Sequence, residues 1–528
     1  MSNRATLIAF SVVIIYLTLF YQLGGLALVG ADEARYARIA EEMNLRGNYV
    51  TPTLEFRPWL EKPPLLFWLQ AASFKLFGVS EWSARLPVGL TALLTLMCSA
   101  LLGLELGGRR AAYLTILILA TSPLFFIFGR SASTDMLLTA MLTAALFCGF
   151  RAATRPSPLW GAGLGAALAL ATLAKGPVAL ILAGGIFVLY FLFVRRFPWS
   201  WSQTALALVF TLALAVPWYW QIWVENGYDF VATFWLNHHL ARFLTDLHHH
   251  SQPFWYFLPV LIVGFFPWTF FLGSSAFRAW KLKVEWVSDR YSHLLFLWLW
   301  VLVPLLFFSL SESKLAGYIL PVLPALALLA ALEWEQYLSG DLVAYRAMKP
   351  QMAVLSAFTV LVIIALIFGF HFIYDSITAG VLVALPLAFA IALVRYEFRK
   401  RQPARLFLTL VAGMSLFAAL AFWKAAPVFE DYHSAQDLSL AALPLISQQE
   451  PLVLYRYFHH TAQYYTGYQT TREAVPDLQS LRRYRAEHPQ DRYYVLTQEP
   501  GWRDLQTVFS TRLREQQGNL YLVELQAK

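Results

Sequence analysis

Side chains that could take part in chemistry recur in short polar stretches at the ends of apolar segments. The sequence "DEARYARIAEEM" follows the first apolar segment, and "EKPP", "GRSASTDM", "LAKGP" and "SESKLAGY" come later in the chain. The ionisable and hydroxyl residues of interest in them are Asp32, Arg35, Glu61, Lys62, Arg130, Asp135, Lys175, Glu312, Lys314 and Tyr318. Charges beside or within a membrane are costly, so each is a functional hypothesis.

The combination of carboxylates, cations and an apolar setting favours group transfer from a lipid-linked phosphate. A phosphate leaving group gains negative charge, which fixed cations such as Arg35, Lys62 and Lys175 can stabilise. A carboxylate such as Asp32 can orient an acceptor or take its proton. The sequence has no Gly-rich phosphate loop for a soluble nucleotide. A donor carried on a lipid is therefore favoured.

Each residue alone also has a structural interpretation. Asp32 can be an interfacial charge or a helix cap, and Asp135, after "SAST", can be a helix N-cap. Lys175 can extend to the lipid head groups. Arg38 can belong to a solvated helix face or contact anionic lipid. The functional interpretation depends on the whole set.

Five histidines within thirteen residues raise the question of a metal. They are His238, His239, His248, His249 and His250, in "NHHLARFLTDLHHH". Neutral imidazoles together with a carboxylate such as Glu61 would suit zinc or a similar divalent ion. Their spacing matches neither a zinc finger nor HExxH, so a polar loop is the alternative.

The elements that must position these residues are membrane helices. The chain of 528 residues is 58% hydrophobic and only 14% charged, well below the roughly 25% of soluble domains. Thirteen apolar stretches approach the length of about 20 residues that crosses a bilayer. They are 6–28, 86–105, 111–128, 135–151, 159–174, 177–194, 203–220, 256–275, 292–310, 318–333, 351–373, 378–395 and 405–423. The first stretch is expected to be a retained helix rather than a signal peptide.

The basic residues predict the orientation. With the N-terminus in the cytoplasm, every even-numbered connection is basic, as the positive-inside bias requires. The residues concerned are Arg109, Arg110, Arg151, Arg155, Arg195, Arg196, Arg278, Lys281, Lys283, Arg346, Lys349, Arg395, Arg399, Lys400, Arg401 and Arg405. The net charge of +8 thus reflects topology and gives no reason to expect a nucleic-acid partner. The candidate site residues then all face outward.

The polar regions define the predicted domains. A membrane domain is expected over 1–423, with external loops 29–85 and 221–255, and an extracytoplasmic α/β domain over 424–528. In the first loop, "DEARYARIAEEMNLRG" predicts a helix that stops at Gly47, and "PPLLFWLQAASFKLFG" predicts an interfacial amphipathic helix. "PLVLYRY", "DRYYVLT" and "NLYLVEL" predict strands in the second domain. Cys98 and Cys148 lie in different apolar segments and do not indicate a disulfide.

The polar motifs resemble those of a known family. "DEARYARIAEEM" and "EKPP", followed in order by "GRSASTDMLLT", "LAKGP", "NHHLARF" and "SESKLAGYILPVLP", resemble the bacterial aminoarabinose transferases. These are GT-C membrane glycosyltransferases related to protein O-mannosyltransferases. The resemblance implies about thirteen transmembrane helices, a small external C-terminal domain, and an inverting transfer of a sugar from polyprenyl phosphate at the outer face of the bacterial inner membrane.

The resemblance also implies roles for individual residues. Asp32 matches the catalytic aspartate, and Asp135 and Lys175 match further residues of the catalytic cavity. The donor phosphate is expected to contact Arg35, Lys62, Lys314 and Tyr318, the last in a mobile loop. Glu61, His239 and His250 are the expected metal ligands, although His238 replaces an acid of the family pattern.

The sugar and the acceptor stay open at the level of sequence. Aminoarabinose transfer to lipid A or lipopolysaccharide is the main expectation, and transfer of a hexose, uronic acid or mannose to another glycan or to protein is the alternative. If the acceptor is a hydroxyl, Asp32 would act as a general base. A lipid-sugar flippase would show inverted repeats and broken helices at the midplane, and the sequence shows neither. The expected partners are thus a polyprenyl-linked sugar, its acceptor and membrane lipids, with the protein a monomer.

Overall fold

Long apolar helices make up most of the protein. The computed structural model describes residues 4–526 except 156, 196, 198, 245–251, 274–291 and 341. Within these residues, eight helices are long and apolar enough to cross a membrane. They are Glu81–Ala120, Thr134–Thr154, Trp201–Ala241, His293–Leu310, Ala316–Leu338, Met348–Tyr374, Ile377–Arg399 and Pro403–His433. Shorter apolar helices occupy Ala5–Phe20, Leu65–Phe77 and Val178–Val194. The chain is therefore a multi-pass membrane protein, as predicted.

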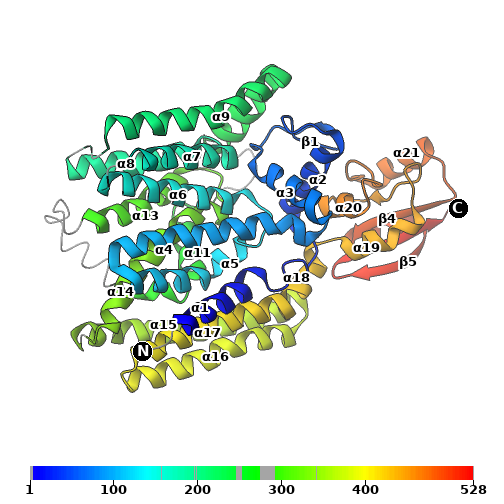
Figure 1. Cartoon of the computed structure of the whole chain (residues 1–528). Helices are drawn as coiled ribbons and strands as arrows, with labels where there is room; N and C mark the ends of the chain where they lie inside the picture. Colours follow the sequence, from blue (N-terminus) through cyan, green and yellow to red (C-terminus); the bar gives the residue numbers. More distant parts are fainter. Residues whose placement is uncertain are drawn as a thin grey trace.

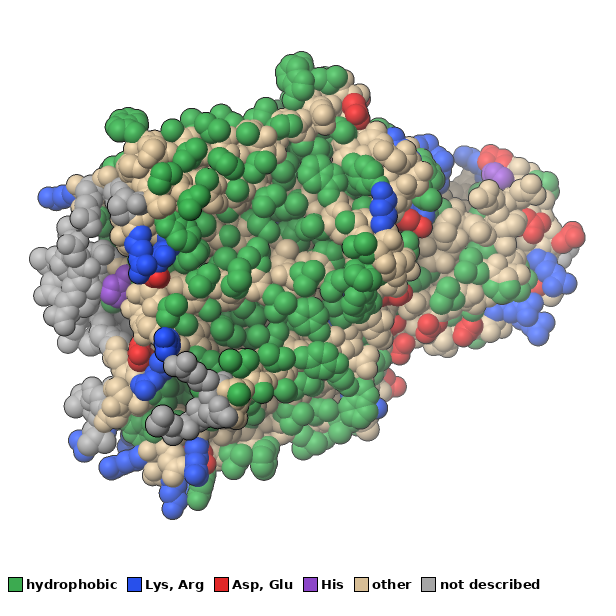
Figure 2. All heavy atoms as spheres, viewed as in Figure 1, with side chains coloured by type: hydrophobic (Ala, Val, Ile, Leu, Met, Phe, Trp, Pro, Cys, Tyr) green, Lys and Arg blue, Asp and Glu red, His purple; other side chains and the backbone are tan. Residues whose placement is uncertain are grey.

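The helices form one bundle with a small sheet at one end (Figure 1). Hydrophobic side chains cover the middle of the face seen in Figure 2, and charged side chains gather towards its two ends. Up to the middle of the chain the elements are α1 (Arg4–Ile15), η1 (Tyr16–Phe20), α2 (Gly30–Arg46), β1 (Thr53–Leu54), β2 (Arg57–Pro58), α3 (Leu65–Phe77), α4 (Glu81–Ala120), α5 (Pro123–Phe128), α6 (Thr134–Thr154), α7 (Pro158–Lys175), α8 (Val178–Val194), α9 (Trp201–Phe230), η2 (Val231–Ala241), α10 (Arg242–Leu244), α11 (Phe257–Gly264) and η3 (Trp268–Phe271).

The second half completes the bundle and adds the sheet. Its elements are α13 (Ser292–Leu310), η4 (Ala316–Val322), α14 (Leu323–Leu338), α15 (Leu342–Tyr374), α16 (Ile377–Arg399), α17 (Pro403–Leu420), η5 (Ala421–Ala425), α18 (Ala426–His433), α19 (Gln436–Ala442), η6 (Leu443–Leu445), β3 (Val453–Leu454), α20 (His460–Tyr465), α21 (Leu478–Glu487), β4 (Arg492–Gln498), α22 (Glu499–Val508), β5 (Ser510–Gln517) and β6 (Leu520–Gln526). Among them η1, η2 and η5 are π-helical and η3, η4 and η6 are 3₁₀.

Each of the thirteen predicted stretches contains helix, but several differ in their limits. The first helical run ends at Phe20 rather than at residue 28. The second and third stretches share α4, whose break is at Gly108 with φ 77°, and the third continues into α5. The stretch 256–275 is divided into α11 and η3, because a cis proline, Pro267, interrupts the helix. The helical run through α9 and η2 continues to Ala241, with a break at Gly227 (φ 54°), into a region expected to be a polar loop.

Small residues allow the bundle to pack tightly. A Cβ on Gly161 would lie 2.3 Å from the carbonyl oxygen of Gln203, and one on Gly165 equally close to that of Ala207. The two glycines therefore bring α7 and α9 into direct backbone contact, the usual way in which membrane helices associate. An 18-residue apolar segment of α6 is 78% buried and one of Ala316–Leu338 is 83% buried, which places these helices at the centre of the bundle.

The C-terminal region, residues 426–526, contains a four-stranded sheet in the order β3-β4-β6-β5. β3 pairs with β4 in parallel, and the other pairs are antiparallel. The three strands predicted from sequence are β3, β4 and β6. The strand β5, "STRLREQQ", was not predicted because seven of its eight residues are polar or charged and most are exposed, as is usual at a sheet edge.

Candidate active site

The helix α2 presents Asp32 and Arg35 as a pair. It starts at Gly30 and ends before Gly47, both with positive φ, so the glycine stop was predicted correctly. Asp32 and Arg35, one turn apart, form an ion pair, and the Asp32 side chain is 50% exposed. Burial disfavours the charged form of Arg35, but Asp32 and Glu61 outweigh this effect and raise its pKa above the ordinary value. Arg35 is thus a permanent cation beside a reachable carboxylate.

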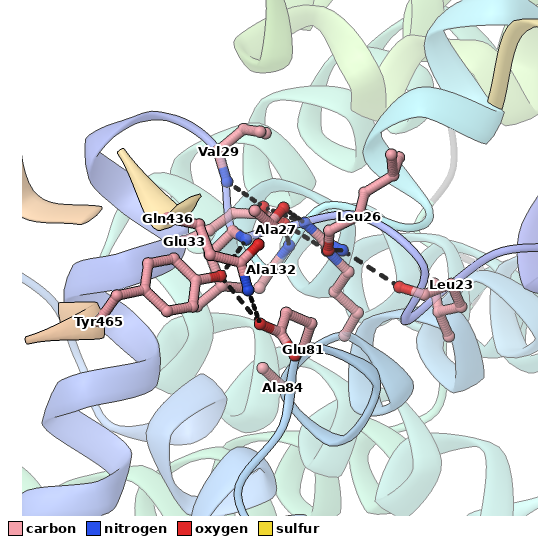
Figure 3. Close-up of polar contacts among 12 residues, drawn as sticks. Leu23, Leu26, Ala27, Val29, Glu33, Glu81, Ala84, Ala132, Gln436 and Tyr465 are labelled. Atoms are coloured by element: carbon pink, nitrogen blue, oxygen red, sulfur yellow. Dashed lines mark hydrogen bonds and ion pairs between the residues drawn. The ribbon is translucent and has the colours of Figure 1, made fainter. Parts of the chain in front are cut away.

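The neighbouring Glu33 fixes where α2 begins. Its carboxylate is buried and accepts two hydrogen bonds from Arg85, at 3.0 and 2.7 Å. It also accepts the backbone N–H groups of Val29 and Ala132. Arg85 in turn donates to the carbonyl groups of Leu23, Leu26 and Ala27 (Figure 3). The loop before α2, the start of α4 and the turn before α6 are thereby held together.

An ion pair also joins Asp135 to Lys175. The Lys175 ammonium lies 4.4 Å from the centre of the Tyr318 ring. Ser133, not Asp135, is the N-cap residue of α6, so the capping interpretation of Asp135 is wrong. Lys175 does not extend freely to head groups either, since its side chain is 14% exposed. Three of the predicted motifs, which are far apart in sequence, thus meet here.

Two glycines make these approaches possible. A Cβ on Gly317 would lie 2.8 Å from the carboxylate of Asp135. Gly176, in "LAKGP", has φ +84°, and a Cβ there would lie 2.4 Å from Nε2 of His239. The turn after α7 therefore needs glycine both for its backbone and for the histidine against it. His239 also contacts the carbonyl oxygen of Phe234 through Nδ1, at 2.6 Å.

A cavity of about 570 Å³ opens beside these groups. Its polar wall comes from the predicted motifs, and the rest is apolar. The lining residues are Glu61, Lys62, Lys175, Pro177, Val178, Ile181, Trp235, Leu236, His238, His239, Leu240, Phe243, Phe307, Phe308, Ser311 and Tyr318. Such a cavity suits a ligand with an anionic head and a hydrocarbon chain.

Not every predicted residue lines this cavity. Asp32 and Arg35 are absent from its wall, and Asp135 contacts it only through Lys175. Lys314 is buried and donates to the backbone carbonyl groups of Gln252 and Ser311, so the structure places it as a tie between two segments. His250 lies outside the described residues, as do His248 and His249.

The expected metal ligands do not converge within the part of the chain that the structure describes. No group of three or more His, Cys, Asp or Glu side chains is found there in a metal-binding arrangement. Glu61 lies 3.8 Å from Nε2 of His238, and the expected partner, His239, faces Gly176 instead. The requirement for a metal therefore stays a prediction, since one of its expected ligands, His250, lies outside the described residues.

Some residues near the site were not predicted. Arg85 is one of these, and the packing of α20 of the C-terminal region on α2 was not predicted either. His460 of α20 has its pKa lowered to about 4, by burial first and then by the nearby charge of Arg35. Arg85 could have been selected from the sequence, because in "EWSARLP" it is a charged residue four positions into an apolar helix. The proximity of α20 carried none.

Comparison with known proteins adds independent findings. Residues 61–223 match the family model described as dolichyl-phosphate-mannose-protein mannosyltransferase. An undecaprenyl phosphate-alpha-4-amino-4-deoxy-L-arabinose arabinosyl transferase of Shewanella sediminis is 34% identical over 347 residues, which are 62% of this chain and 59% of that protein. Its counterpart in Pectobacterium carotovorum subsp. carotovorum is 36% identical over 329 residues, 61% of this chain and 58% of the relative. The match thus spans somewhat under three fifths of these relatives.

Solved structures match over nearly the whole chain. The crystal structure of ArnT from Cupriavidus metallidurans bound to undecaprenyl phosphate has a TM-score of 0.78 and 25% identity, covering 98% of this chain and 97% of that one. An Archaeoglobus fulgidus oligosaccharyltransferase shares the fold alone, with a TM-score of 0.52, 12% identity and coverage of 94% and 69%. Together with the ordered motifs, these comparisons show that the chain has the fold of ArnT and, over about three fifths of its length, a sequence similar to the aminoarabinose transferases.

Proposed function

We propose that the protein transfers a sugar, aminoarabinose or a related one, from a polyprenyl phosphate to lipid A or a related lipopolysaccharide, by inverting displacement. The observation that carries the proposal is the cavity, whose wall combines the cations Lys62 and Lys175 and a few other polar side chains, among them Glu61, with a mostly apolar lining. A phosphate with a long isoprenoid chain has that distribution of charge. The similar ArnT structure is bound to undecaprenyl phosphate.

The donor would lie with its phosphate against the cations. Lys62 and Lys175 would stabilise the charge that develops as the bond between sugar and phosphate breaks. Asp135 holds the Lys175 ammonium in place, and Tyr318 covers it. The apolar side chains of Ile181, Phe307 and Phe308 would receive the first isoprene units.

The acceptor would react on the side of α2. Asp32 is half-exposed and forms an ion pair with Arg35. The charge of Glu61, which lines the cavity, helps to raise the pKa of Arg35. For a phosphate acceptor, already anionic at neutral pH, Asp32 would orient the nucleophile. For a hydroxyl acceptor it would remove the proton as the new glycosidic bond forms. Inversion follows because the acceptor attacks from the face opposite the leaving phosphate.

The proposal includes the predicted location in the bacterial inner membrane, with the N-terminus in the cytoplasm. It is supported by the gathering of Lys and Arg side chains at the end of the molecule away from the C-terminal region (Figure 2). Cysteine accessibility at Arg110 and at Asp491 in intact and permeabilised cells tests the orientation. A requirement for a divalent metal remains a prediction, which metal analysis of the purified protein tests.

The substitution Asp32→Asn tests the activity. It should abolish transfer from a purified polyprenyl phosphate sugar while leaving membrane insertion and thermal unfolding unchanged. Asp491→Asn, an exposed aspartate in the C-terminal region, is the matched control and should retain wild-type turnover. Wild-type turnover in Asp32→Asn would contradict the assignment.

A protein hydroxyl is a second candidate for the acceptor. The matched family model is that of protein mannosyltransferases, which favours a protein hydroxyl as the alternative. Mass spectrometry of lipid A and of exported proteins, from cells with and without the gene, separates the two. A mass increment on lipid A that disappears with the gene supports the main proposal, and one on protein alone replaces it.

A further inference from the structure

Arg130 is a buried cation without a counter-ion among the described residues. It lies in the turn between α5 and α6 and is 6% exposed. Its Nη1 has no hydrogen-bond partner, and no carboxylate of the described chain lies within ion-pair distance. The motif "GRSASTDM" contains it, yet the proposed donor site does not use it. Buried charges are normally paired, so an unpaired one requires an explanation.

The carboxylate whose charge acts on Arg130, that of Glu33, already has several partners. Glu33 accepts two hydrogen bonds from Arg85 and two from backbone N–H groups, which leaves little capacity for a second guanidinium. The Arg130 guanidinium instead stacks on the ring of Phe422, 3.5 Å from its centre. Burial first, and the charge of Arg85 second, lower the pKa of Arg130 to about 9. It therefore stays cationic at neutral pH.

The surroundings of Arg130 are also unusual in their backbone. Phe422 belongs to η5, and Gly129 is packed so closely against Leu19 of η1 that a Cβ would lie 2.8 Å from it. Both segments are π-helical, a form that is rare and frequently marks functional sites. Ser133, in the same turn, has a buried hydroxyl with no hydrogen-bond partner among the described residues.

This position is separate from the donor cavity. The cavity is lined from α7, α8, η2, α13 and η4, whereas Arg130 faces η1 and η5. In Figure 1, α1 and α17 lie on one side of the bundle and α7, α8 and α9 on the other. Tyr16, Leu416 and Trp423, on the η1 and η5 side, are each at least 50% exposed, as expected for a surface in contact with hydrocarbon.

We propose that Arg130, with Ser133, binds a phosphate group of the lipid acceptor, which enters from the bilayer between η1 and η5. A guanidinium pairs two of its donors with a phosphate, and the serine hydroxyl adds a third. The acceptor then approaches the α2 region from the side that the donor does not occupy. The inference rests on the proposed function, because it supplies that reaction's second substrate.

The unfolding temperature of the ligand-free protein distinguishes a ligand-binding role of Arg130 from a structural one. Arg130→Met removes a buried charge that no described group neutralises, so the ligand-free protein should unfold at the same temperature or higher. A structural arginine would give the opposite result. A fall of several degrees in the unfolding temperature of purified, ligand-free Arg130→Met would overturn the proposal.

Binding is measured on the full-length protein in nanodiscs, as the rise in unfolding temperature with four probes. A diphosphorylated glucosamine lipid should stabilise the wild type but not Arg130→Met, with Arg130→Lys intermediate. The dephosphorylated lipid should stabilise neither. Inorganic phosphate alone should give no comparable rise, and an equal rise would overturn the lipid assignment. Arg110→Met, an exposed arginine of α4, should behave as wild type.

The fourth probe, undecaprenyl phosphate, separates this inference from the proposed function. Its stabilising effect should be the same in wild type and Arg130→Met. An Arg130→Met protein that responds to the phosphorylated acceptor like the wild type overturns the inference and leaves the donor site intact. In turnover, the acceptor KM should rise about tenfold or more while kcat changes little, since about 1.4 kcal/mol of binding corresponds to tenfold. A change in kcat alone would also overturn it.

Discussion

At the scale of single residues, the geometry of the site depends on glycines, which let neighbouring groups approach closely. Gly317 allows η4 to approach Asp135, and Gly176 allows His239 to pack against the turn after α7. Each glycine sets the position of a side chain that the sequence marks as a candidate for the chemistry. The charged residues could be selected from sequence because charge is rare in apolar segments. The glycines could not, because their role depends on what approaches them.

Gly317→Ala should therefore impair the Asp135–Lys175 pair. The new Cβ would lie 2.6 Å from the Phe128 ring and 2.8 Å from the Asp135 carboxylate, so one of the two must move. We expect turnover to fall by tenfold or more and stability by about 1–3 kcal/mol, the usual cost of overpacking. Gly369→Ala in α15, where a Cβ has open space, is the control. Equal turnover in both variants, measured with saturating donor, would contradict this role for Gly317.

The sequence predicted which residues gather at the site more completely than it predicted their partners. Lys62, Lys175, Glu61, His239 and Tyr318 do line one cavity. Lys314 was expected beside the donor, yet it donates to two backbone carbonyl groups. The sequence alone does not show whether a lysine will contact a ligand or the backbone, because that depends on the fold. His238 rather than His239 stands near Glu61, since adjacent residues in a helix point in different directions.

At the scale of elements, hydrophobic runs located the helices but not their breaks. Helices such as α6 and α16 agree with the predicted stretches to within a few residues. The stretch 256–275 divides at a proline, and α9 continues past its predicted end because its aromatic residues remain apolar enough. Apolar length is a local property of the sequence, whereas a break depends on the backbone conformation at one residue.

The Glu33–Arg85 pair is expected to be the most sensitive contact between elements. Glu33→Gln would leave the Arg85 guanidinium buried with only carbonyl partners, which typically costs about 3–5 kcal/mol. The loop before α2 would lose its anchor, and transfer would fall with stability. Thermal unfolding in detergent measures the effect, and Glu41→Gln, in a more exposed pair with Arg38, is the control. A Glu33→Gln protein as stable as this control would refute the anchoring role.

At the scale of the whole molecule, the C-terminal region is part of the support of the site. The Tyr465 hydroxyl accepts the N–H of Leu28 at 2.7 Å and donates to Glu81 at 2.9 Å. Gln436 contacts the same carboxylate, as Figure 3 shows, and Gln463 donates to Glu55. Three strands of this region were predicted, but its docking onto α2 was not, because contacts between residues more than 350 positions apart leave no local pattern.

Tyr465→Phe should weaken this support. It removes one hydrogen bond to the loop before Asp32 and one to a carboxylate, at a cost of about 1–3 kcal/mol. Turnover should fall severalfold while the membrane helices stay folded, which limited proteolysis of the C-terminal region against the bundle would show. Tyr228→Phe, at an exposed tyrosine, should change neither. Unaltered turnover in Tyr465→Phe would mean that the docking is not needed for catalysis.

The same interface should make stability depend on pH. His460 has a pKa of about 4 in the folded protein, against an ordinary value of 6.5, because it is buried and near Arg35. Between these values the unfolded chain binds a proton that the folded protein does not, so stability falls as the pH drops from about 6.5 to 4 and is constant above. His460→Gln should reduce this slope in unfolding temperatures between pH 7 and 5. His459, whose pKa burial also lowers, would contribute to the remaining slope.

The place of Tyr465 in the chain has a consequence for biosynthesis. The loop that leads into Asp32 is made at the start of translation, but the hydroxyl that holds Leu28 is made more than 430 residues later, after every apolar helix. A nascent chain can therefore insert all its helices and still lack the contacts that steady the start of α2. If the C-terminal region lies outside the cytoplasm, as proposed above, sugar transfer would be acquired only after that region has crossed the membrane and folded.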